Sequence, residues 1–166
     1  MFELKRLGRE AVPAALEKAQ RYRLLNEPIE AESICLDVLA VDPENAEALV
    51  TLVLSLSDQF ERRLGDKFDQ ARALLARLPS EYERRYYAGI LCERRAKVSL
   101  GQGGPGSGAV AYQWFREAMQ HFDEAHAIRP EGNDDSTLRW NTCARILNRN
   151  PAVVAHSDEP SREMLE

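Results

Sequence analysis

The sequence predicts an all-α protein, and three observations lead to this prediction. Eight prolines, at positions 13, 28, 43, 79, 105, 130, 151 and 160, divide the chain into windows. Within those windows apolar residues recur at spacings of three and four, which is the period of one helix face. Runs that alternate β-branched and polar residues, as a half-buried strand would, are almost absent. Because proline is tolerated in the first turn of a helix and excluded from its interior, the prolines mark helix ends.

About seven helices are expected. The first spans residues 12–25 and starts at Pro13, and a short Asn26-Glu27-Pro28 turn leads into the second. Asp42-Pro43-Glu44-Asn45 ends the second helix, and a third follows over 46–60. The remaining helices are expected over residues 66–78, 80–100, 109–128 and 134–147. The segment 101–108 holds five of the nine glycines and is expected to be a flexible loop, and residues 149–166 lose the helical period and are expected to form a flexible tail.

Composition and charge limit the class of protein. The 166 residues, 44% hydrophobic, suffice for one domain or a short row of repeats. The 22 Lys and Arg against 27 Asp and Glu give a net charge of −5, which argues against nucleic acid as the main partner. Three widely spaced cysteines indicate a reducing compartment, and no segment has the pattern of a secretory signal or a membrane span. We therefore expect a cytoplasmic protein that does not bind membranes.

One packing motif occurs twice in the chain. Ala31, Cys35, Val38 and Pro43 have the same spacing as Ala118, Phe122, Ala125 and Pro130: a small residue, a larger one four positions on, a small one three further, then a proline past the helix end. This spacing resembles the second helix of a tetratricopeptide repeat (TPR).

The TPR resemblance implies a right-handed superhelix of antiparallel helix pairs over residues 1–148. Its repeat units would span residues 12–45, 46–81 and 82–132, with a capping helix at 134–148 and the glycine-rich loop inside the third unit. In this register Gly89 and Cys92 take small-residue positions of a first helix. A small residue there lets two helices approach closely, which explains a glycine that costs about 1 kcal/mol in helix propensity.

The same resemblance implies a function. In TPR proteins the first helix of each pair lines a concave groove that takes a peptide or helix of a partner protein. Matched positions in this chain are Leu16, Gln20, Arg23, Val50, Leu54, Ser57, Tyr86, Ile90, Glu93, Arg94, Asn141 and Arg145. The Lys and Asn of the chaperone-binding carboxylate clamp are missing, and the mixed apolar, Arg and Tyr character suits an amphipathic or extended acidic segment. We expect a non-catalytic adaptor or scaffold, with self-association through apolar ends left open.

A basic stripe leaves a second interpretation open. Residues 84–97 contain Arg84, Arg85, Arg94, Arg95 and Lys97 with interleaved tyrosines, a composition that could bind single-stranded RNA. The alternative is that these cations pair with carboxylates of neighbouring helices, namely Glu61, Asp66, Asp69 or Glu117. The acidic net charge favours this pairing and, for any partner, an acidic peptide over RNA.

Candidate catalytic and metal residues are few. His121 and His126 are five apart and point about 140° away from each other on a helix, so they cannot share one metal. Glu117, His121 and Glu124 do share a face, but no second Glu-x-x-His copy exists to complete a metal site. The cysteines fall at expected core positions, and the glycine loop lacks the Lys-Ser/Thr ending of a phosphate-binding loop. We expect no catalytic residue, metal or cofactor, and thus no enzyme.

Overall fold

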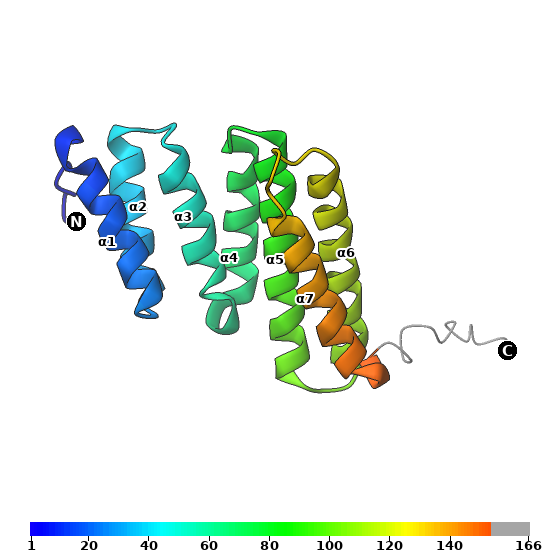
Figure 1. Ribbon diagram of the computed structural model, residues 1–166. Helices are drawn as coiled ribbons and strands as arrows, with labels where there is room; N and C mark the ends of the chain where they lie inside the picture. Colours follow the sequence, from blue (N-terminus) through cyan, green and yellow to red (C-terminus); the bar gives the residue numbers. More distant parts are fainter. Residues whose placement is uncertain (154–166) are drawn as a thin grey trace, which may run out of the picture. The chain divides into compact units, whose positions relative to one another are not determined.

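The computed structural model describes residues 1–153, and all regular structure within them is helical (Figure 1). The α-helices are α1 (Val12–Leu24), α2 (Pro28–Val41), α3 (Ala46–Ser57), α4 (Phe60–Leu74), α5 (Glu81–Gln102), α6 (Ser107–Ala127) and α7 (Asp135–Arg149). Two short 3-10 helices, η1 (Arg9–Ala11) and η2 (Leu75–Arg77), precede α1 and follow α4. The all-α prediction is confirmed. Of the described helices, none combines the length and the apolar character needed to cross a bilayer.

The chain divides into two compact bodies. The N-terminal body comprises Met1–Tyr87 and the C-terminal body Ala88–Glu166, so the division falls inside α5. In the N-terminal body consecutive helices pack together, α1 on α2, α2 on α3 and α3 on α4. In the C-terminal body α6 packs on α7. Each body has its own buried side chains.

The helix starts follow from local chemistry. Pro13 and Pro28 lie in the first turns of α1 and α2. Asn26, in the turn between these helices, has φ 59°, a left-handed conformation that asparagine tolerates better than most residues. The Asn45 side chain caps α3 by accepting a hydrogen bond from the Ala48 amide at 2.9 Å. The α5 start has a capping box, in which Ser80 Oγ accepts from the Glu83 amide at 3.1 Å and Glu83 Oε2 accepts from the Ser80 amide at 3.3 Å.

Several helix boundaries differ from the sequence expectation; for example, α3 ends at Ser57 rather than near residue 60. Helix α4 starts at Phe60 rather than near residue 66, and non-helical angles at Arg63 (φ −145°, ψ 54°) kink it. Helix α5 continues through Gly101 to Gln102, so only residues 103–106 connect it to α6. Gly103 and Gly106 have φ of 55° and 81° in this connection, which explains the need for glycine there. Helix α7 extends to Arg149, and residues 154–166 of the expected tail lie outside the described residues.

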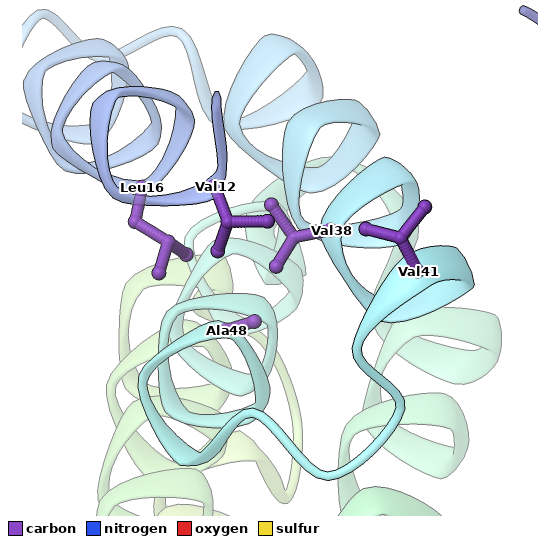
Figure 2. Close-up of a cluster of buried hydrophobic side chains, with 5 residues drawn as sticks. All are labelled: Val12, Leu16, Val38, Val41 and Ala48. Atoms are coloured by element: carbon purple, nitrogen blue, oxygen red, sulfur yellow. The ribbon is translucent and has the colours of Figure 1, made fainter. Parts of the chain in front are cut away.

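The first three helices of the N-terminal body share a cluster of aliphatic side chains. Figure 2 shows side chains from three helices converging: Val12 and Leu16 of α1, Val38 and Val41 of α2, and Ala48 of α3. All five are buried, and their spacing reproduces the three-and-four period of the sequence. Burying such a side chain stabilises the fold by about 1.5–3 kcal/mol for Val or Leu, so this cluster joins the first three helices.

The C-terminal body has an aromatic core. Phe115 and Phe122 of α6 are fully buried, with alanines at neighbouring turns of the same face. Gly89 of α5 lies against the Phe122 ring, so closely that a Cβ added at Gly89 would be 2.5 Å from Phe122 Cε1. The predicted close approach of two helices at Gly89 is confirmed, because the absent side chain leaves the room that the Phe122 ring fills.

Candidate functional site

Four of the predicted groove residues come together in the N-terminal body. Gln20 and Arg23 of α1 and Val50 and Leu54 of α3 line a cleft of about 300 Å³. The rest of its lining comes from α3 and the first turn of α5: Ala46, Glu47, Thr51 and Glu83. Helices α1, α3 and α5 are the first helices of the predicted pairs, so the cleft lies where the repeat register expects a binding surface.

Hydrogen bonds across the cleft hold its polar side chains. Gln20 Nε2 donates to Glu47 Oε1 at 2.7 Å, which links α1 to α3. Arg23 Nε donates to Asp58 Oδ2 at 2.8 Å in an ion pair whose side chains are about four-fifths buried. Counting Asp58, Glu47 and Glu83 against Arg23, the cleft region is acidic. The positive charge of Arg23 is already paired with Asp58, and Val50 and Leu54 contribute apolar lining to the cleft.

Tyr86, also predicted to line the groove, belongs to an aromatic cluster at the start of α5. Its ring stacks on Tyr82 with centroids 5.8 Å apart and meets the edge of Tyr87 at 5.1 Å. The side chain is half-buried. Part of the Tyr86 surface therefore serves packing within the N-terminal body rather than a partner.

In the C-terminal body, two predicted groove residues do not reach the surface. Ile90 and Glu93 are only 2% and 1% exposed, although the repeat register placed them in a groove. The Glu93 carboxylate is covered because Lys97 of the same helix pairs with it and Arg139 of α7 donates to its Oε1 at 3.5 Å. The repeat register could not foresee that Arg139 of α7 would contact Glu93 on this face.

The other predicted residues of the C-terminal body remain accessible to different degrees. Arg94 and Asn141 are half-buried, and Arg145 is exposed. None of these three is among the residues that line the described clefts.

Several cations of the basic stripe of α5 have described partners. Arg84 and Arg85 both bind Glu81 of their own helix, with N–O distances of 3.1 and 2.9 Å. The hydrogen bond from Arg85, followed by that from Arg84, holds the pKa of Glu81 below its ordinary value. The Arg95 guanidinium lies 4.1 Å from the ring centroid of Trp114. The described partners of these cations are thus a carboxylate within α5 and an aromatic ring of α6, and pairing with carboxylates of neighbouring helices stays a prediction.

The three cysteines are buried, as the sequence predicted. Burial raises the pKa of both Cys35 and Cys143 to about 12, because the thiolate would lose its hydration. At neutral pH these two thiols are protonated and therefore poor nucleophiles. Both have a packing role.

The sequence analysis considered Glu117 and His121 together but missed Cys92 as a third donor beside them. Cys92 of α5 and Glu117 and His121 of α6 bring one sulfur, one oxygen and one nitrogen to within 4.8 Å of one another. Glu117 and His121 also line a cleft of about 790 Å³, together with Arg116, Met119, Gln120, Asp123 and Trp140. The sequence offered only the four-residue spacing of Glu117 and His121 on one helix. The third donor comes from another helix, and only folding brings it near.

Comparison with known proteins gives no further guidance. No family model matches the chain, and no curated protein or solved structure is significantly similar to it.

Proposed function

We propose that this protein is a cytoplasmic, non-catalytic adaptor with a TPR-like arrangement of helix pairs, and that it binds a segment of a partner protein. The proposal depends most on the cleft of the N-terminal body. Gln20, Arg23 and Leu54 were selected from the repeat register alone, and they line one cleft between first helices of successive pairs. Two further observations support the same architecture: the turns between neighbouring helices are short, and the Ala-large-small motif occurs twice.

The charge of the cleft refines the expected partner. An acidic segment would meet Glu47 and Glu83 in the cleft, while Arg23 is already neutralised by Asp58. Like charges at an interface disfavour binding, whereas a Lys or Arg on the partner would complement them. Val50 and Leu54 offer apolar contact to the same segment. The preferred partner segment is therefore amphipathic, with at least one basic residue, rather than acidic as the basic stripe suggested.

The RNA-binding alternative has weaker support. Phosphate recognition needs cations that can exchange their partners for phosphates at little cost. Arg84 and Arg85 share Glu81, Lys97 pairs with the buried Glu93, and Arg95 stacks on Trp114. These contacts compete with phosphate, and the net charge of −5 opposes RNA at long range.

A peptide-display screen against the purified chain tests the proposal. We expect selected peptides to share apolar residues spaced for one helix face or strand face, with basic residues beside them. Leu54→Glu should weaken their binding about tenfold or more, because it places a charge against the apolar part of the partner. Leu36→Glu is the matched control, since Leu36 is a 52% exposed leucine of α2 that does not line the cleft.

Two results would reject the adaptor proposal. One is equal loss of binding in the Leu54 and Leu36 variants, which would locate recognition elsewhere. The other is selection of acidic peptides whose binding Leu54→Glu does not change. A salt-dependent mobility shift with single-stranded RNA at low ionic strength would instead favour the RNA alternative.

A further inference from the structure

We propose that Cys92, Glu117 and His121 form a binding site for a divalent cation of the zinc class in the C-terminal body. Their donor atoms, one sulfur, one carboxylate oxygen and one imidazole nitrogen, all lie within 4.8 Å of one another. The site is independent of the proposed partner cleft, which is lined by residues of the N-terminal body.

The chemical types of the three donor atoms indicate which metal ion the site prefers. Thiolate, imidazole and carboxylate together are typical of Zn²⁺, whereas Mg²⁺ and Ca²⁺ prefer oxygen ligands alone. Tetrahedral coordination with bond lengths of about 2.0–2.3 Å separates donors by roughly 3.3–3.8 Å. The donor atoms lie at most 4.8 Å apart, so the largest separation exceeds the tetrahedral spacing by no more than about 1.5 Å. Rotamer changes of Glu117, whose side chain is about half exposed, and of His121, whose side chain is 23% exposed, can supply this movement.

The surroundings of His121 favour metal binding through one particular nitrogen. Its Nε2 lies 3.9 Å from Glu117 Oε1, while its Nδ1 lies 3.9 Å from Glu124 Oε2. Nδ1 is buried and has no hydrogen-bond partner within the described part of the chain. With the cation on Nε2, Nδ1 carries the proton and faces Glu124. A carboxylate behind the second ring nitrogen orients the ligand histidines of many metal sites.

The site has an entry path and an open coordination position. Glu117 and His121 line the cleft of about 790 Å³, so solvent reaches two of the three ligands, while Cys92 is 4% exposed and anchors the site from α5. A water molecule can complete the tetrahedron from the cleft. On binding, the Cys92 thiol loses its proton to solvent and forms a sulfur–metal bond, so affinity falls as the pH is lowered.

Cobalt(II) titration of the untagged, reduced full-length chain tests the site, because tetrahedral Co²⁺ bound to a thiolate has a near-ultraviolet charge-transfer band and visible d–d bands. We expect one equivalent to bind with both features and Zn²⁺ to displace it. His121→Gln and Glu117→Gln should each weaken binding about 100-fold or more, since each removes a direct ligand. His126→Gln is the matched control on the same helix and should bind like the parent chain, because His126 is not among the three donors.

A separate variant tests whether the Cys92 thiolate is a metal ligand. Cys92→Ser should abolish the charge-transfer band, and circular dichroism checks that the buried substitution leaves the helices intact. If Cys92→Ser does not fold, the half-buried His121 decides the question, since His121→Gln leaves the core in place. A charge-transfer band absent at one equivalent, a band retained in Cys92→Ser, or unchanged affinity in His121→Gln would each overturn the proposal.

Discussion

The two bodies contain the same packing motif, but with residues of different size at one position. In the N-terminal body the second position of this motif is Cys35, and in the C-terminal body it is Phe122; both side chains are fully buried. The large Phe122 ring is accommodated by Gly89, which presents no side chain to it. In the N-terminal body, aliphatic residues from α1, α2 and α3 pack together (Figure 2), and the buried rings of Phe60 and Phe68 contact each other, with centroids 5.8 Å apart. The comparison shows that the repeat specifies spacing, while the facing helix must complement the size of whatever residue fills it.

Charge is also distributed differently in the two bodies. In the N-terminal body Lys67 of α4 binds Glu32 of α2 at 2.8 Å, with both side chains largely buried. Glu32 also accepts from Gln59 at 2.6 Å, so this ion pair and its neighbour connect two helices. In the C-terminal body one buried carboxylate, Glu93, is shared by two half-exposed cations, Lys97 and Arg139. Loss of one cation should therefore matter more in the N-terminal body.

Phe122→Ala against Cys35→Ala should produce the largest contrast. Removing the Phe122 ring loses its burial and leaves a cavity, a change that costs about 3–5 kcal/mol in free energy of unfolding. Cys35→Ala removes a single sulfur and should cost about 1 kcal/mol or less. Urea denaturation followed by circular dichroism measures both. Similar losses for the two variants would show that the two positions do not differ as the structure indicates.

Gly89→Ala tests the helix approach directly. The added methyl would lie 2.5 Å from the Phe122 ring, and overpacking of this kind costs about 1–3 kcal/mol, which exceeds or cancels the helix-propensity gain of about 1 kcal/mol. Gly101→Ala is the control in the same helix, because nothing lies within 4 Å of its added Cβ. We expect a lower midpoint of thermal unfolding for Gly89→Ala and a slightly higher one for Gly101→Ala. A stabilised Gly89→Ala variant would contradict the close packing.

Lys67→Met and Lys97→Met compare the buried ion pairs of the two bodies. Lys67 is 9% exposed and its loss leaves the Glu32 charge with only Gln59, so we expect a cost of about 1–3 kcal/mol. Lys97 is 42% exposed and Arg139 still neutralises Glu93, so its loss should cost about 0.5 kcal/mol. Denaturant unfolding at low and high salt distinguishes the two. Equal costs would mean that burial of the Lys67 pair is not what distinguishes the bodies.

The sequence by itself determined the helical class and most helix ends, because these depend on neighbours in the chain. Pro28 in the first turn of α2, Asn45 as the cap of α3 and the Ser80 capping box of α5 are all local features. The requirement for a small residue at Gly89 followed from the repeat spacing. The kink at Arg63 was missed, because position 63 holds neither proline nor glycine, the residues that most often mark a helix kink.

The tertiary structure alone decided which surfaces are available for binding. Packing of the helices brings Gln20, Arg23 and Leu54 to one cleft, and it places Arg139 of α7 against the buried Glu93, which helical periodicity could not foresee. Nor could it place Cys92 beside His121, because the two lie on different helices. Helix periodicity records which face of a helix is apolar. Which helix covers that face, and which donors then meet across the interface, depends on packing between segments far apart in the chain.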